Sequence, residues 1–266
     1  MSSTFVKPNS SNALLSIENI TMQFGGVIAV NDLSMAIPKD SIVGLIGPNG
    51  AGKTTAFNVI SGFYTPQKGH VNFNNKDITG KAPHLVCKAG IARTFQNIRL
   101  SGHLSAIENV MVGCHVRRKQ PWWMAPLSLP IFIKEEDEIR EHAKKLIDKL
   151  DLTAYINENA HSLPYGVQRR LEIARALATQ PNFLLLDEPA AGMNPQESIE
   201  LMHFIEHIRK EFNLTILLIE HDMKVVMGVC QYIWVMEYGC LIAEGQPDVI
   251  RSNPDVIKAY LGDGIL

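Results

Sequence analysis

The stretch that most constrains the fold of this chain is residues 47–54, which read Gly-Pro-Asn-Gly-Ala-Gly-Lys-Thr. They fill every defining position of the pattern G-x-x-x-x-G-K-[ST], whose glycine-rich backbone curls around phosphate groups. Residues 41–46 before it form an apolar run of strand length, and residues 53–61 after it contain neither proline nor glycine, as a helix requires. Because both flanks agree with the motif, we predict a strand, a phosphate-binding loop and a helix rather than an ordinary glycine-rich turn.

This loop predicts a specific set of phosphate contacts. Its backbone N–H groups and the N-terminus of the following helix attract negative charge, Lys53 reaches the β- and γ-phosphates, and the Thr54 hydroxyl ligates Mg²⁺. The predicted nucleotide-binding residues of the loop are Gly47, Pro48, Asn49, Gly50, Ala51, Gly52, Lys53, Thr54 and Thr55.

Composition excludes several other classes of protein. Of 266 residues, 46% are hydrophobic and 20% are charged, as in a soluble globular protein. Because 25 Lys and Arg stand against 27 Asp and Glu, no overall basic field favours nucleic acid as a partner. The four cysteines form no close CxxC pair and are expected to be thiols. Apolar runs such as residues 183–186 are too short to cross a bilayer and no signal-peptide pattern is present, so we expect any membrane role to be peripheral.

Two residues near the ends of expected strands are ambiguous from the sequence. Phe24 closes the strand expected at residues 14–24, before a second strand at 27–37, and it either stacks on adenine or lies in the core. Gln96 follows the strand expected at residues 91–95. Its amide either ligates Mg²⁺ or positions water beside a nucleotide, or it is merely a polar residue at a strand end.

A pair of carboxylates follows the buried parallel strand expected at residues 183–186. Asp187 and Glu188 are delivered at the carboxyl end of that strand, where α/β sheets place their ligands. An Asp there can hold the hydration shell of Mg²⁺, and the adjacent Glu can polarise a water for attack on a γ-phosphate. His221 follows a second such strand at residues 215–219, although a lone histidine is more often structural.

The middle of the chain is expected to form a helical lobe. Residues 105–118 and 134–150 have helical patterns, and the segment between them is broken by prolines and carries Trp122-Trp123, for which packing is the simplest explanation. Residues 163–177 are a further strong helix former.

The order of these motifs resembles that of the ATP-binding subunits of ABC transporters, over nearly the whole chain. The chain is also similar to the longer of the two paired ATPases of branched-chain amino-acid uptake systems, through residues 93–100, 108–113, 165–166 and 190–195. The resemblance implies an α/β fold: a P-loop NTPase core of the ABC ATPase type, with an antiparallel β subdomain and an inserted α-helical subdomain.

The resemblance also implies roles for individual residues. Phe24 becomes the residue that stacks on adenine, Glu188 the general base and His221 the γ-phosphate contact, with ATP and Mg²⁺ as cofactors. Gln96 becomes the catalytic-site sensor that faces the membrane subunits, and it joins Thr54 and Asp187 in the metal set. The signature element that contacts the nucleotide of a partner ATPase corresponds to Leu163, Pro164, Tyr165, Gly166, Val167 and Gln168.

This signature departs from the family-wide sequence Leu-Ser-Gly-Gly-Gln. Only Leu163 and Gly166 match, and the serine hydroxyl that would touch the opposite γ-phosphate is absent. Asn194 stands where the loop after the two carboxylates usually has Asp, which keeps hydrogen bonding and removes a charge. Both departures put in doubt the hydrolysis rate at the partner's site.

The resemblance further implies an organisation and an assembly. Residues 1–12 are expected to be a flexible tail and residues 13–266 a single ABC ATPase domain, in which 97–179 form the helical subdomain and 13–96 with 180–266 the core and β subdomain. The expected partners are a second ATPase in a heterodimer, two transmembrane permease subunits and a periplasmic or extracellular substrate-binding protein, with no nucleic acid. The chain would lie peripherally on the cytoplasmic face of the plasma (inner) membrane.

Three functions remain open at this point. The first is the ATPase of an importer for branched-chain or other amino acids, and the second is a related ATPase for urea or lipopolysaccharide-type cargo. The third is a soluble ABC-type ATPase, which is the weakest because neither a second ATPase core nor a heptad pattern is present in the sequence.

Overall fold

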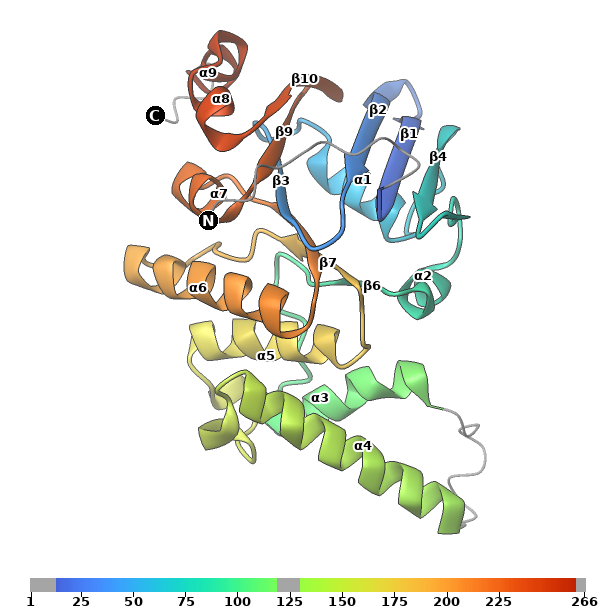
Figure 1. The fold of residues 1–266 in the computed structure, drawn as a ribbon, viewed down its shortest axis with the longest axis vertical. Helices are drawn as coiled ribbons and strands as arrows, with labels where there is room; N and C mark the ends of the chain where they lie inside the picture. The colour runs from blue at the N-terminus through green and yellow to red at the C-terminus, as the bar shows by residue number, and fades with distance from the viewer. Residues whose placement is uncertain (1–12, 119–129, 262–266) are drawn as a thin grey trace.

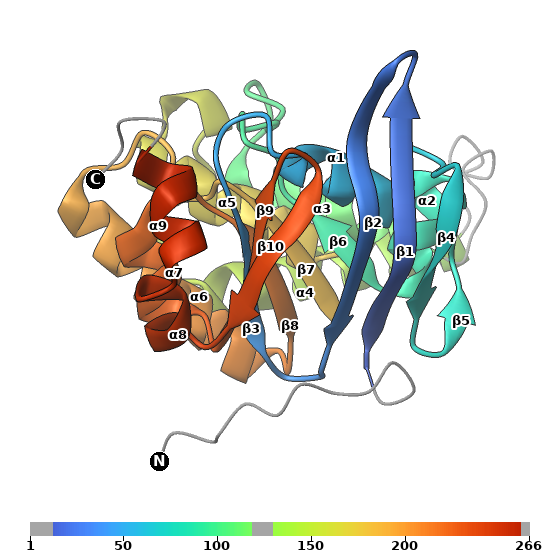
Figure 2. The same cartoon turned by 90° about the horizontal axis from the view of Figure 1, so that it is seen from above.

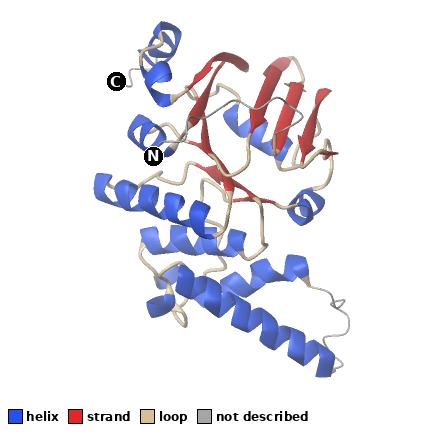
Figure 3. Cartoon of the chain, in the orientation of Figure 1, coloured by secondary structure: helices blue, strands red, loops and turns tan. Residues whose placement is uncertain are grey.

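The computed structural model describes residues 13–118 and 130–261. Within these ranges a mixed sheet contains β3 (Ile42–Ile46), β6 (Ile91–Arg93), β7 (Phe183–Asp187), β8 (Thr215–Ile219), β9 (Tyr232–Glu237) and β10 (Cys240–Gly245). Its order is β10-β9-β3-β8-β7-β6, and all pairs are parallel except the hairpin of β9 and β10 (Figures 1 and 3). Parallel neighbours require crossover connections, which the helices supply.

An antiparallel sheet stands beside the mixed one. It contains β1 (Leu15–Phe24), β2 (Val27–Ile37), β4 (Lys68–Phe73) and β5 (Lys76–Asp77), in the order β2-β1-β4-β5. Figure 2 shows this sheet on one side of the molecule. Helix α1 (Lys53–Ile60) packs in one apolar core with residues of both sheets, so the β subdomain and the parallel sheet share the helix that begins at the phosphate loop.

Alternate residues of the central strands serve two different cores. In β3, Val43 and Leu45 join the core with α1 and the antiparallel sheet, whereas Ile42 and Ile46 join the core on the other face. Because side chains alternate between the faces of a strand, a sheet that is covered on both faces needs a continuous apolar run. The buried parallel strands expected at residues 183–186 and 215–219 are confirmed.

Helices cover the remaining surfaces. Along the chain they are α2 (Pro83–Ala89), α3 (Ala106–Cys114), η2 (His115–Arg117), α4 (Pro130–Lys149), η4 (Thr153–Tyr155), η5 (Ala160–Ser162), α5 (Tyr165–Leu177), α6 (Pro195–Glu211), α7 (Met223–Val229), α8 (Pro247–Arg251) and α9 (Pro254–Leu261). Figure 1 shows α3, α4 and α5 together at one end of the molecule, and Figure 2 shows α6 to α9 opposite the antiparallel sheet. No helix of the described part combines the length and apolar character that a bilayer span needs.

Several element boundaries differ from those expected. Strand β6 ends at Arg93 rather than at residue 95, because Phe95 leaves the ladder and its ring meets the guanidinium groups of Arg93 and Arg99. Helix α4 begins at Pro130 rather than at residue 134, since proline suits the first turn of a helix. The four cysteines are free, as expected. The expected tail at 1–12 and the Trp122-Trp123 pair lie outside the described residues, and the subdomain boundaries stay a prediction.

Candidate active site

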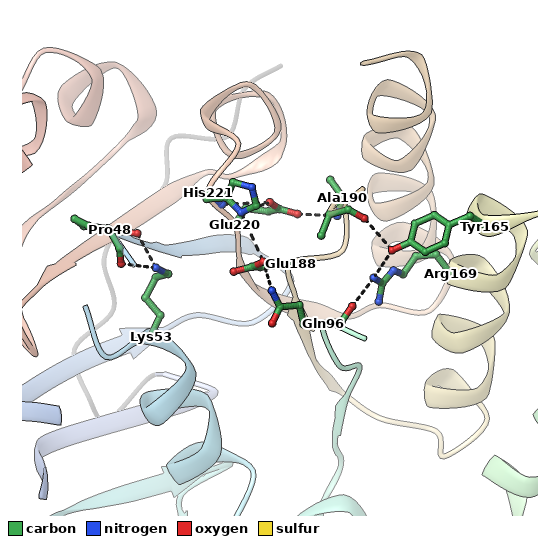
Figure 4. Close-up of polar contacts among 11 residues, drawn as sticks. Pro48, Lys53, Gln96, Tyr165, Arg169, Glu188, Ala190, Glu220 and His221 are labelled. Carbon is green, nitrogen blue, oxygen red and sulfur yellow. Dashed lines mark hydrogen bonds and ion pairs between the residues drawn. The ribbon is translucent and has the colours of Figure 1, made fainter. Parts of the chain in front are cut away.

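The carboxyl ends of four neighbouring strands lie along one edge of the mixed sheet. In that edge β3, β8, β7 and β6 are mutually parallel neighbours, and Leu45 and Asp187 both pair with Ile219 of β8. The residues that follow these strands therefore gather in one place (Figure 4). They are the phosphate loop after β3, His221 after β8, Glu188 after β7 and Gln96 after β6.

The backbone of the phosphate loop can be formed only with glycine at two positions. Gly47 has φ 150° and Gly52 has φ 99°. A Cβ atom on Gly47 would lie 2.1 Å from the carbonyl oxygen of Met236, and one on Gly52 would lie 2.2 Å from that of Ala29. Gly52 is also the N-cap of α1 and offers no side-chain cap, so no capping oxygen competes with an anion for the first N–H groups of this helix.

Lys53 is held inside the curl of this loop. Its side chain starts the buried face of α1, and its Nζ atom donates to the carbonyl oxygens of Gly47 at 2.6 Å and Pro48 at 2.8 Å (Figure 4). Thr54, the next residue, is exposed. The ammonium group therefore lies within the loop, and its contact with the β- and γ-phosphates stays a prediction.

Glu188 is the point at which two other predicted residues meet. Gln96 donates from Nε2 to Oε2 of Glu188 at 2.7 Å, and Nδ1 of His221 lies 3.7 Å from the same oxygen (Figure 4). Glu188 itself has φ 44°, a left-handed conformation that is costly for a residue with a side chain. Strained backbone of this kind clusters at functional sites, so the geometry at Glu188 agrees with a catalytic role.

Asp187 has a partner that sequence reasoning missed. Arg93 donates from Nη2 to Oδ2 of Asp187 at 2.7 Å, and each of the two side chains is 7% exposed. The same guanidinium donates from Nη1 to Asn58 at 2.6 Å and to Ser61 at 3.0 Å, so it ties β7 to the helix of the phosphate loop. In the sequence, Arg93 lies inside the strand expected at residues 91–95 and begins the stretch 93–100 that carries the family resemblance, but neither feature indicated that it pairs with Asp187.

The predicted metal set is only partly gathered. Thr54, Gln96 and Asp187 offer a hydroxyl, an amide and a carboxylate, which are the oxygen ligands that Mg²⁺ prefers. Asp187 is buried, and its Oδ2 already accepts from Arg93 at 2.7 Å. The residue types therefore fit Mg²⁺, although Gln96 bonds to Glu188 in this structure.

A second overlooked residue is Glu220, whose carboxyl group lies next to the site. Glu220 is fully buried, and it accepts from the backbone N–H of Ala190 at 2.7 Å and of His221 at 3.2 Å. Burial raises the pKa of Glu220 above its ordinary value, while these N–H groups and His221 oppose the rise. Glu220 thus bonds to the backbone that follows β7 and to the backbone that follows β8.

The predicted signature residues lie at the start of α5 and contact a different part of the chain. Leu163 is buried, Pro164 and Tyr165 are exposed, and the remaining three are partly buried. Tyr165 donates from its hydroxyl to the carbonyl oxygen of Ala191 at 2.8 Å, and Gln168 donates to that of Leu163 at 2.7 Å. Figure 4 shows Tyr165 and Arg169 apart from Lys53 and Pro48, with Gln96 and Glu188 between them, so the signature and the phosphate loop are separate within this chain.

Two further expectations can be compared with the structure. Phe24 is 43% exposed and its ring meets Tyr64 edge-on, with centroids 5.2 Å apart, so the core alternative for Phe24 is wrong. Asn194 is the N-cap of α6, and its Oδ1 accepts from the N–H groups of Gln196 and Glu197 at 3.0 Å each. The departure from Asp at this position therefore keeps a helix cap.

A glycine-rich loop, paired carboxylates and a histidine at one edge of a parallel sheet define a phosphate-loop nucleotide-binding domain. Comparison with known families agrees: the ABC transporter model matches residues 30–191. A second model, described as branched-chain amino acid ATP-binding cassette transporter, matches residues 240–265. This chain belongs to the ABC transporter family.

Curated relatives match along almost their full length. The branched-chain amino acid transport ATP-binding protein BraF of Pseudomonas aeruginosa is 44% identical over 95% of this chain and 99% of its own length. LivG of Escherichia coli, also a high-affinity branched-chain amino acid transport ATP-binding protein, is 45% identical with the same coverage. The relatives are therefore of the kind that the sequence motifs indicated.

Solved structures confirm the predicted fold class. The ADP conformation of an ATP-binding cassette of an ABC transporter superposes with a TM-score of 0.83 at 33% identity, and the match covers 94% of this chain and 98% of that one. A nucleotide-free ATP-binding cassette gives a TM-score of 0.82, with coverage of 93% and 98%.

Proposed function

We propose that this chain is the ATP-binding and ATP-hydrolysing subunit of an ABC importer for branched-chain amino acids. The observation that carries the proposal is the meeting of Gln96 and His221 at Oε2 of Glu188, on the strand edge that also bears the phosphate loop. The names of BraF and LivG, and the match of residues 240–265 to a branched-chain amino acid cassette model, support the cargo.

Each predicted residue would perform one part of ATP binding and hydrolysis. The exposed ring of Phe24 stacks on adenine, Lys53 and the loop N–H groups bind the phosphates, and Glu188 takes a proton from the attacking water. His221 contacts the γ-phosphate, and Gln96 reports the position of the membrane subunits. Thr54, Gln96 and Asp187 would hold Mg²⁺, which when bound screens the negative charge of the phosphates.

The working unit would be a head-to-tail heterodimer of two ATPases, with two permease subunits and an external binding protein, on the cytoplasmic face of the membrane. The support is the separation of the signature from the phosphate loop, because a second chain is then needed to complete each site. A partner with the full signature serine would complete the site built on Lys53 and Glu188. The altered signature beginning at Pro164 would complete the partner's site and make the two sites unequal.

Light scattering of the Glu188→Gln protein with ATP, alone and with the candidate partner ATPase, tests this assembly. The mixture should give the mass of a heterodimer only when ATP is present, since the substitution keeps ATP bound between the two chains. Tight ATP-dependent self-dimers, with normal hydrolysis by the unmutated protein and no gain from the partner, would contradict it.

Coupling and cargo need separate tests. A cysteine at Asn97 or Arg99, both exposed, should cross-link to the permease subunits, because the stretch from Gln96 to Ile156 is where we place the docking surface. Failure from several positions in an intact assembly would favour a soluble ATPase. Deletion of the gene should abolish uptake of labelled leucine, and loss of urea uptake instead would reassign the cargo.

A further inference from the structure

The loop that follows Glu188 is held from two sides. On the inner side, the buried carboxyl group of Glu220 accepts from the N–H of Ala190 at 2.7 Å. On the outer side, Tyr165 donates from its hydroxyl to the carbonyl oxygen of Ala191 at 2.8 Å (Figure 4). The ring of Tyr165 also covers Gly192, since three of its atoms lie 3.8 to 3.9 Å from the place a Cβ on Gly192 would occupy.

The same hydroxyl is connected in the opposite direction to the Gln96 segment. Arg169, one turn along α5, donates from Nη2 to the Tyr165 oxygen at 3.2 Å and to the carbonyl oxygen of Gln96 at 2.8 Å. Its Nη1 donates to the carbonyl oxygen of Phe95 at 2.8 Å and to Glu172 at 2.9 Å. Arg169 and Glu172 are 0% and 1% exposed, so this buried ion pair holds the guanidinium group that donates to the Tyr165 hydroxyl in a fixed position.

Position 165 gives this chain a link that the family-wide signature does not offer. Leu-Ser-Gly-Gly-Gln has glycine at the corresponding place, and glycine has no side chain that could reach another loop. In this chain the ring crosses from the start of α5 to Gly192 and Ala191, and its hydroxyl is both a donor to Ala191 and an acceptor from Arg169. One oxygen atom therefore joins the signature, the Gln96 segment and the loop after the catalytic carboxylates.

We propose that Tyr165 is a positioning residue whose hydroxyl fixes the loop of residues 189–194 relative to the Gln96 segment, so that displacement of Gln96 is transmitted to the loop beside Glu188. The inference rests on the proposed function only for the catalytic role of Glu188. The contacts of Tyr165 stand independently of that role. Since the side chain of Tyr165 is 42% exposed and packs at the surface, removal of its oxygen leaves the core unchanged.

Hydrogen exchange in the full-length Tyr165→Phe protein tests the link. The N–H groups of Ala191 and Met193 bond to the carbonyl oxygens of Glu188 and Ala190, at 3.1 Å each, so their exchange reports on the geometry of the loop. Loss of one neutral hydrogen bond should speed exchange in residues 189–194 by about three- to tenfold. Exchange in β3 and β8 should not change. Ser162→Ala is the matched control, because it removes an exposed side-chain bond to Asn159, at 2.8 Å, that does not involve the loop.

Steady-state hydrolysis by the assembled ATPases gives the second readout. Tyr165→Phe should lower kcat by about two- to tenfold and leave KM for ATP within about twofold, because orientation changes while the phosphate contacts do not. Unchanged exchange in residues 189–194 would overturn the proposal, and so would faster exchange with an unchanged kcat. If the wild-type assembly hydrolysed no ATP, the proposed function would fail, whereas the exchange result would still decide whether Tyr165 holds the loop.

Discussion

The strand edge and the start of α5 are built in different ways. At the strand edge, Glu188 directly follows β7, and Lys53 follows the loop after β3 and donates to two carbonyl oxygens of that loop. At the start of α5, Tyr165 and Arg169 act on backbone oxygens that lie 26 and 73 residues away in the chain. The strand edge thus holds the side chains expected to react with ATP, whereas the start of α5 orients segments that are distant in the sequence.

This difference explains which departures from the family pattern the chain tolerates. Every residue that would contact ATP from its own chain keeps the type that the motifs require, because each performs a specific chemical task. The signature and the loop after Glu188 depart from the pattern, and in both places the new residue makes contacts of its own: Tyr165 bonds to Ala191, and Asn194 caps α6. The residues that would contact ATP therefore keep the types that the motifs require, whereas the residues that position other segments differ from the family pattern.

The largest effect on ATP hydrolysis at the strand edge is expected from Glu188→Gln. An amide keeps the shape of the side chain and loses its basicity, so we expect hydrolysis to fall by about 10²- to 10⁴-fold, with ATP binding retained. Single-turnover hydrolysis measures the chemical step. Glu200→Gln, on the exposed face of α6, is the matched control. Turnover at the wild-type rate by Glu188→Gln in the assembled complex would show that the base is another residue.

Lys53→Ala should have the next largest effect, on ATP affinity. Loss of a charge-assisted contact to phosphate weakens binding by about 1.5–3 kcal/mol, which is about 10- to 150-fold in Kd. Titration of a fluorescent ATP analogue measures this change, and circular dichroism checks that the fold is retained. Lys68→Ala, an exposed lysine of β4, should bind ATP as the wild type does. Equal affinity for Lys53→Ala and Lys68→Ala would contradict the loop assignment.

The sequence was sufficient where a residue's place depends on its immediate neighbours. The phosphate loop, Asp187 and Glu188 were predicted because an apolar run followed by glycine or carboxylate defines a strand end without further information. The buried parallel strands were expected from the continuity of apolar residues, whereas the antiparallel β subdomain was expected from the resemblance to ABC ATPases, and the structure confirms both.

The sequence was insufficient where a residue acts on a distant segment. Arg93 pairs with Asp187 across 94 residues of chain, and Glu220 reaches Ala190 across 30 residues. Neither contact leaves a local pattern, because hydrogen-bonding side chains at such separations are brought together only by the tertiary fold. For the same reason Tyr165 was expected only as one residue of the signature, and its bond to Ala191 was not anticipated.

In the loop after Glu188, a smaller effect is expected from Asn194→Ala, on the free energy of unfolding. The side chain of Asn194 satisfies two N–H groups at the start of α6 and takes part in a capping box with Glu197, so its loss should lower the free energy of unfolding by about 1 kcal/mol. Urea denaturation measures the change. Asn194→Asp is the control, because a carboxylate caps equally well and restores the residue that this loop usually has. A stability loss of equal size for both variants would show that the cap is not the cause.

The smallest effect is expected at Glu220, and it depends on pH. Burial raises the pKa of Glu220 in the folded protein above its value in the unfolded chain, which is about 4.3. The contribution of this group to stability is therefore fully present below the unfolded pKa, and it is lost as the pH rises through the folded pKa. Glu220→Gln keeps an oxygen that accepts from Ala190 and cannot ionise. The variant should therefore match the wild type at pH 4 and become the more stable of the two by pH 8.

Urea denaturation of both proteins at several pH values between 4 and 8 measures this difference. His221 and Cys230 are the titratable groups whose charge interacts with Glu220, so the comparison is repeated in the His221→Ala background to remove the titration of the histidine. If the stabilities of wild type and Glu220→Gln stay parallel from pH 4 to 8, the carboxyl group is not held at a raised pKa. In that case the loop beside Glu188 would be supported on its inner side by a fully ionised carboxylate and not by a titrating one.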